Sequence, residues 1–158
     1  QKGFRAKILK TSKAIKEIEK NSSKDIGKIS KRELWLMGVV LYWRERLLNK
    51  NDEDLKKGIR FTSSDPHLIS FFLKWLNDVG GIKNEEISFD IFIEKDNQNL
   101  LNEAVNYWAG ITGFSKANFS RYYILKKSKR SLLRIRVRAS SMLARQISGW
   151  AKGISKLY

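Results

Sequence analysis

An alternating segment near the end of the chain most constrains the fold. In residues 132–140, LLRIRVRAS, three aliphatic side chains alternate with three arginines. A period of two is typical of a β-strand that has one buried and one exposed face. The segment therefore predicts a strand whose exposed face carries Arg134, Arg136 and Arg138. Neighbouring arginines on one strand face lie only about 6.6 to 7 Å apart, so they repel one another unless a negative group lies over them.

The charge of the chain suggests what that negative group is. Residues 104–158 contain twelve Lys or Arg and no Asp or Glu, and the whole chain has a net charge of +16. A like-charged surface of this size repels itself and is usually tolerated when an anionic polymer neutralises it. Nucleic acid is the leading partner, and a charge excess for solubility or for a ribosome surface is the plainer alternative. An anionic membrane fits less well, because the C-terminal bases lie on elements whose other faces are needed for a core.

Composition excludes several classes of protein. The chain has 158 residues, of which 42% are hydrophobic, so it can bury one full core. No apolar run reaches about 18 residues and no hydrophobic segment follows the basic start, so we expect a cytoplasmic, nucleoid-associated protein without a membrane partner. The absence of Cys and the presence of one His exclude disulfides, thiolate metal sites and a histidine zinc cluster. The chain begins at Gln1, which leaves open whether a segment precedes it.

Hydrophobic periodicity and capping residues predict the order of the elements. We expect two regions, a basic helical arm with its linker in residues 1–28 and a DNA-binding domain in residues 29–158. The expected helices span residues 4–20, 30–48, 66–79, 97–111 and 141–157, and a polar loop spans residues 49–58. The expected strands span residues 59–64, 86–94, 120–127 and 131–139, the last two joined as a hairpin by the basic turn SKR.

This order predicts an α+β fold, in which helices pack on one face of a curved, mostly antiparallel sheet. The other face would then bind nucleic acid, since a twisted antiparallel ribbon fits the major groove of duplex DNA, where arginine reads guanine and contacts phosphates. An edge strand kept from aggregating by its arginines is the plainer interpretation. The lack of acids in the C-terminal block favours binding. The candidate DNA-binding residues are Arg60, Thr62, Arg121, Lys126, Lys127, Lys129, Arg130, Arg134, Arg136 and Arg138.

The helix at residues 30–48 carries a family resemblance. Its segment LWLMGVVLYWRER resembles the motif helix of LAGLIDADG homing endonucleases, and GIRFTSSDPHLISFFLKWL resembles the strand and helix that follow this motif. LYWRER, FTSSDP and the terminal GWAKGI are similar to LYWAEG, FTNSDP and GWxxGI in small bacterial proteins, and the resemblance covers most of residues 29–155. It implies an αββαββα core. A helix-turn-helix segment often precedes this region in such relatives, and none is visible in this chain.

The resemblance implies a magnesium-dependent DNA endonuclease, with Glu45 as the catalytic and metal-binding residue. In the family, carboxylates from two motif helices hold the magnesium, and phosphate and water complete its oxygen shell. Here Trp43 replaces the first acid of the motif and Arg46 replaces its closing glycine. One Glu for each chain is enough only in a dimer, and the adjacent arginine weakens binding of a divalent cation.

Three hypotheses follow. The first is sequence-specific binding of double-stranded DNA with weak or absent cleavage, the second is an active magnesium-dependent endonuclease, and the third is binding of structured RNA, as in a maturase. The altered motif favours the first. A motif helix that is apolar on all sides needs helical partners, which predicts a two-fold homodimer. Its expected interface residues are Leu36, Met37, Gly38, Val39, Leu41 and Tyr42.

Two further residues invite functional readings. His67 follows a proline in the first turn of a helix and is more easily explained as a solvated or capping side chain than as a catalytic base, since no partner acid has a recognisable spacing to it. Phe92 falls on the exposed side of its strand, where it could stack on a base or pack against a partner.

Overall fold

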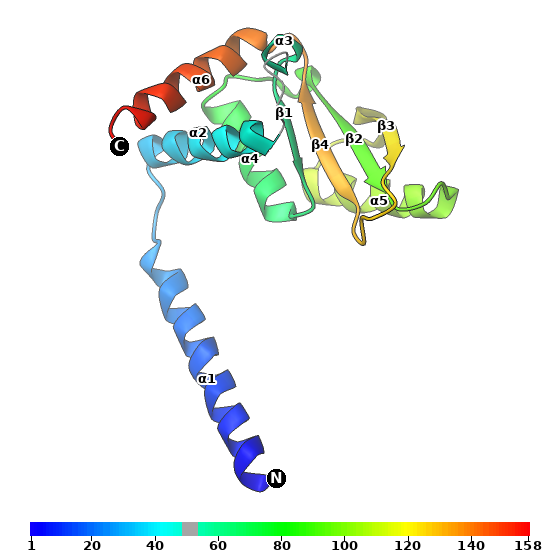
Figure 1. Ribbon diagram of the computed structural model, residues 1–158. Helices are drawn as coiled ribbons and strands as arrows, with labels where there is room; N and C mark the ends of the chain where they lie inside the picture. The colour runs from blue at the N-terminus through cyan, green and yellow to red at the C-terminus, as the bar shows by residue number, and fades with distance from the viewer. Residues whose placement is uncertain (49–53) are drawn as a thin grey trace. The chain divides into compact units, whose positions relative to one another are not determined.

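The computed structural model describes residues 1–48 and 54–158 (Figure 1). These residues form two compact units, 1–34 and 35–158, whereas the sequence places the division after residue 28. The first unit holds helix α1 (Lys2–Asp25) and the start of α2 (Lys31–Leu48). The second holds the remainder of α2 and the following elements: α3 (Asp54–Lys57), β1 (Arg60–Ser63), α4 (Pro66–Asp78), η1 (Asn84–Glu86), β2 (Ile87–Ile93), α5 (Gln98–Thr112), η2 (Lys116–Asn118), β3 (Phe119–Ile124), β4 (Leu132–Val137) and α6 (Ser141–Ser155).

The α+β class is confirmed, and most elements lie close to their predicted positions. The first helix is longer than expected, because the polar segment after residue 20 continues α1 to Asp25 instead of ending it. The predicted polar loop at 49–58 contains the short helix α3, and its residues 49–53 lie outside the described part of the chain. Local signals fix the ends of two longer helices: Asp65 Oδ1 accepts from the first N–H groups of α4, and Gly113, with φ of 73°, ends α5 in the left-handed conformation.

The strand order is β1-β4-β2-β3, so the last strand of the chain lies inside the sheet (Figure 1). β4 pairs antiparallel with both β1 and β2, while β3 pairs parallel with β2. The predicted hairpin of the last two strands is therefore wrong, because β2 separates β3 from β4. The sheet is mixed, although two of its three pairings are antiparallel as expected.

One face of the sheet forms the core of the second unit. Phe61, Phe89, Ile91, Leu133 and Ile135 alternate along the strands and are at most 2% exposed. Helices α4 and α5 cover this face, and Phe72 of α4 stacks on Phe61 with a centroid distance of 4.5 Å. Burial of such aromatic and aliphatic side chains is the main force that holds helices on a sheet. The opposite face of the sheet carries charged, polar and aromatic residues.

Helix α2 packs against two other helices of the same chain. Gly38 lies so close to the Trp75 indole of α4 that an added Cβ would come within 2.0 Å of the ring. Tyr42 stacks on Phe72 of α4, and Trp35 meets Trp150 of α6 edge to face at 5.4 Å. The expectation that this apolar helix needs two partners is met, and both partners come from its own chain.

This packing alters the predicted dimer interface. Gly38, Val39 and Tyr42 are buried within the chain, so in this structure they offer no surface to a second copy. Leu36 and Leu41 are half-buried, and Met37 is 45% exposed. Helices α4 and α6 supply helical neighbours of the kind that a second copy was expected to supply, and the homodimer itself stays a prediction.

Candidate nucleic-acid interface

The strand registers bring charged and aromatic residues together on the face of the sheet opposite to the core. Directly paired residues of neighbouring strands point to the same face. Arg60 pairs with Arg136, Thr62 with Arg134, and Arg134 with Asp90, and β3 places Arg121 beside Asp90. We call this surface the arginine face and define it as Arg60, Thr62, Asp90, Phe92, Arg121, Tyr123, Arg134 and Arg136. The parallel pairing of β3 with β2 thus places Arg121 and Tyr123 on this face.

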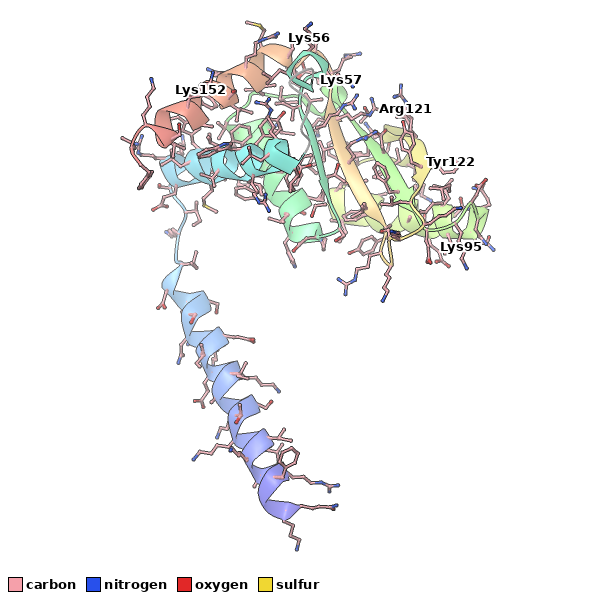
Figure 2. The ribbon with its side chains drawn as sticks, viewed as in Figure 1. Lys56, Lys57, Lys95, Arg121, Tyr122 and Lys152 are labelled. Carbon is pink, nitrogen blue, oxygen red and sulfur yellow. The ribbon has the colours of Figure 1, made fainter. Side chains whose placement is uncertain are left out.

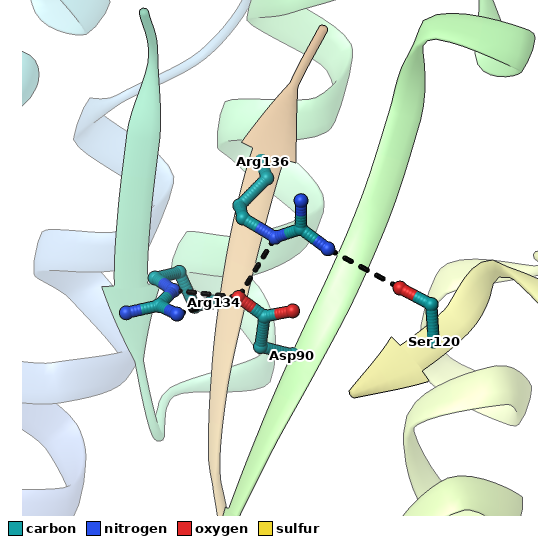
Figure 3. A network of polar contacts seen from close by, with 4 residues as sticks. All are labelled: Asp90, Ser120, Arg134 and Arg136. Atoms are coloured by element: carbon teal, nitrogen blue, oxygen red, sulfur yellow. Dashed lines mark hydrogen bonds and ion pairs between the residues drawn. The ribbon is translucent and has the colours of Figure 1, made fainter. Parts of the chain in front are cut away.

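Asp90 is the negative group that lies between the arginines (Figure 3). Its Oδ2 accepts from Nε of Arg134 and from Nε of Arg136, both at 2.8 Å, and lies 2.6 Å from Nη2 of Arg134. Asp90 is fully buried, whereas the two arginine side chains remain about 20% exposed. Nη2 of Arg136 also donates to Ser120 Oγ at 3.2 Å. These bonds hold both guanidiniums in fixed orientations, because charge-assisted hydrogen bonds are short and strong.

The position of Asp90 differs from the expectation that no acidic residue lies near the arginines. The absence of acids after residue 104 suggested that the arginines have no acidic neighbour, but β2 brings Asp90 from residues 33–103, which contain thirteen acids and nine bases. The alternation of ISFDIFI predicts the face on which Asp90 lies. The position of β4 beside β2 was needed to find its partners, and the predicted hairpin concealed it.

The arginine face remains positively charged after this pairing. Four arginines and one aspartate lie on it, so four charges less one leave a net +3. Arg60 and Arg136 stand directly opposite one another on β1 and β4, an arrangement that is destabilising for like charges. Arg121 is exposed on β3 (Figure 2). An anion over the face would relieve this repulsion.

An aromatic pair adjoins the charged residues. Phe92 and Tyr123 stack with a centroid distance of 5.4 Å and an interplanar angle of 27°. The guanidinium carbon of Arg134 lies 5.2 Å from the Phe92 ring centre and 5.4 Å from that of Tyr123. Phe92 was expected to be open for stacking on a base or a partner, but in the structure it stacks with Tyr123. Cation–π contacts with the two rings and the ion pair with Asp90 together hold the Arg134 guanidinium in place.

The remaining predicted contact residues lie outside the arginine face. Lys126, Lys127, Lys129 and Arg130 are exposed in the connection that leads from β3 across the end of β2 to β4. Lys129 and Arg130 line a groove together with Glu94 and Glu103, so these two bases have acidic neighbours. Arg138 follows the end of β4 and is exposed.

Glu45 occupies the last turns of α2 and is half-buried. Its Oε1 accepts a hydrogen bond of 3.1 Å from the backbone N–H of Thr62 in β1. Among the residues that the structure describes, no three His, Cys, Asp or Glu side chains gather where they could share a metal ion. The role of Glu45 in binding magnesium therefore stays a prediction from the sequence.

His67 belongs to the first turn of α4, where its backbone N–H donates to Asp65 Oδ1 at 2.7 Å. Its side chain is exposed, and it lies on α4, whereas the arginine face lies on the strands of the sheet. The structure thus shows a capping contact for the His67 backbone, and a catalytic role of its side chain is not supported by this contact.

The chain was also compared with known proteins. It matches no protein-family model, no curated protein and no solved structure. The resemblance to LAGLIDADG endonucleases therefore stays a prediction from the sequence. Over residues 1–48 and 54–158, none of the helices combines the length and the apolar character needed to cross a bilayer.

Proposed function

We propose that the arginine face binds double-stranded DNA in a sequence-specific manner, with weak or absent cleavage. The observation that carries this proposal is the set of four arginines on one face of the sheet, of which Asp90 neutralises a single charge. Each guanidinium has five N–H donors, so the bonds to Asp90 and Ser120 leave donors for a base edge or a phosphate. Arginines held in fixed orientations are suited to bidentate recognition of guanine.

The antiparallel part of the sheet favours DNA over structured RNA. β1, β4 and β2 form an antiparallel ribbon, and such a ribbon enters the wide major groove of B-form DNA. The major groove of A-form RNA is too narrow and deep for side chains to read. A binding assay should therefore include duplex RNA of the same sequence as a competitor, and we expect DNA to be preferred.

The proposal is tested by replacing Arg121, which is exposed and has no salt bridge among the described residues. A target would be selected from random duplexes and its affinity measured by fluorescence anisotropy at several salt concentrations. If Arg121 reads a base, Arg121→Ala should weaken binding to that target by about 1 to 3 kcal/mol. If it contacts phosphate, all sequences should lose affinity equally and the salt slope should fall by about one.

The matched control is Arg145→Ala, which removes the same charge from an exposed position on α6. It should change binding much less than Arg121→Ala. Equal losses in the two variants would mean that only net charge matters. Unchanged binding in both Arg121→Ala and Arg60→Ala would remove the arginine face from the interface.

Weak or absent cleavage is the second part of the proposal. It is supported by the contact of Glu45 with the Thr62 N–H, which occupies one carboxylate oxygen, and by the cation Arg46 beside it. We expect the selected duplex to stay intact with Mg²⁺, Mn²⁺ or Ca²⁺. Cleavage with Mg²⁺ that is lost in Glu45→Gln while binding persists would establish the endonuclease instead.

A further inference from the structure

Helix α1 carries a regular row of side chains along one side. Phe4, Ile8, Ile15 and Ile18 are between 50% and 71% exposed, and no residue of α1 is buried. Together with Thr11 and Ser22 they are spaced alternately by four and three residues. This spacing is the mark of a coiled coil, in which two helices pack along such a row. We call the row Phe4, Ile8, Thr11, Ile15, Ile18 and Ser22 the α1 seam.

The charged residues of α1 lie outside this seam, so they do not prevent a second helix from packing on it. Six of its eight bases lie outside the seam and outside the positions that flank it: Lys2, Lys10, Lys13, Lys16, Lys20 and Lys24. The positions that flank the seam are Arg5, Ser12 and Glu19 on one side and Lys7, Ala14 and Asn21 on the other. Flanking charges of this kind decide which partner a coiled coil accepts and in which direction it runs.

We propose that the α1 seam pairs antiparallel with the α1 seam of a second copy of this chain. In that arrangement Ile8 packs against the partner's Ile18, and Thr11 packs against the partner's Ile15. Arg5 then lies beside the partner's Glu19, and two-fold symmetry provides this ion pair twice. A parallel pair would place Lys7 beside the partner's Ser12 and would gain no such attraction.

The distribution of acids along α1 supports the same direction. Glu17, Glu19 and Asp25 all lie in the second half of the helix, while the first half carries bases only. An antiparallel pair sets the basic half of each helix against the acid-containing half of the other. The dipoles of two antiparallel helices point in opposite directions, and this arrangement is electrostatically favourable. The pairing does not depend on the proposal for the arginine face, and it replaces α2 as the interface of the expected homodimer.

The direction of pairing can be read from disulfide formation, since the chain has no cysteine of its own. Ile8→Cys and Ile18→Cys would be prepared separately in the full chain, mixed, and oxidised. We expect the mixture to form a cross-linked dimer and each variant alone to remain largely uncross-linked. In an antiparallel pair two copies of residue 8 lie about 15 Å apart along the axis, which is beyond the reach of a disulfide.

If each variant alone forms as much cross-linked dimer as the mixture does, the two helices pair in parallel. This result would overturn the proposed direction. Cross-linking of Lys13→Cys, which lies on the side away from the seam, should be slow in every combination. Equal cross-linking of Lys13→Cys and of the mixed pair would mean random collisions and would also overturn the proposal.

The strength of pairing is tested with two matched substitutions. Ile15→Asn and Leu9→Asn each replace an exposed aliphatic residue of α1, but only Ile15 belongs to the seam. Sedimentation equilibrium should show dimerisation weakened about tenfold or more by Ile15→Asn and nearly unchanged by Leu9→Asn. A wild-type chain that stays monomeric at all concentrations, or equal losses in the two variants, would overturn the proposal.

Discussion

Replacement of Asp90 by Asn tests whether this carboxylate orients the arginine face. The change keeps the shape of the side chain and removes the charge that three contacts of 2.6 to 2.8 Å share. Loss of one member of a buried ion pair costs about 3 to 5 kcal/mol, because the remaining charges stay uncompensated. Both arginines keep about a fifth of their side-chain surface in water, so we expect a loss below this range, about 2 to 3 kcal/mol.

The loss would be measured as the free energy of unfolding in urea, followed by far-ultraviolet circular dichroism. Asp78→Asn is the matched control, since Asp78 pairs with Lys74 on the surface of α4, where both side chains are more than 40% exposed. Such an exposed pair is worth about 0.5 kcal/mol or less. If Asp90→Asn and Asp78→Asn destabilise the protein equally, the contacts of Asp90 do not hold the arginines.

The same variant also separates orientation from charge in DNA binding. Asp90→Asn raises the net charge of the arginine face by one, so binding to random duplexes should strengthen and the salt slope should steepen by about one. Discrimination between the selected target and random duplexes should fall, because Arg134 and Arg136 lose their fixed orientations. Retained discrimination would refute the role of Asp90 in specificity, even if stability falls as expected.

Two further predictions concern the packing around the sheet. Gly38→Ala should destabilise the protein by about 1 to 3 kcal/mol, because its Cβ would collide with Trp75, while Gly149→Ala, which faces open space, should stabilise it by up to about 1 kcal/mol in thermal unfolding. Ser140→Ala should cost about 1 to 3 kcal/mol in the same assay, since the buried hydroxyl accepts from Ile59 N–H at 2.8 Å and donates to a backbone carbonyl. An unchanged melting temperature in Ser140→Ala would contradict this role.

The sequence predicts local structure better than it predicts which elements meet. Leu133, Ile135 and Val137 are buried and Arg134 and Arg136 are half-exposed, as the alternation of β4 requires. Strand alternation and capping depend on residues close in the chain, so they are visible in one sequence. The partner of a strand depends on distant residues. The short basic segment before β4 is typical of a hairpin, yet it leads across the end of β2.

In the candidate site, too, local features are predictable from the sequence and contacts between distant residues are not. The face on which each arginine lies follows from alternation, but the contact of Asp90 with Arg134 and Arg136 follows from strand order. Ser140 directly precedes the last helix and is of a residue type that often caps helices. The structure gives it no side-chain capping bond and uses its hydroxyl to join the backbone at Ile59 and Val137. No local pattern indicates that bond.

The position of β4 governs when the sheet can form during synthesis. β4 leaves the ribosome after β1, β2 and β3, yet both β1 and β2 form their antiparallel hydrogen bonds with it. A nascent chain that ends before Leu132 can pair only β2 with β3, and β1 has no strand beside it. Contacts between distant parts of a chain form late, because the intervening loop must be closed first. The arginine face therefore forms only after synthesis has passed Val137, the last residue of β4.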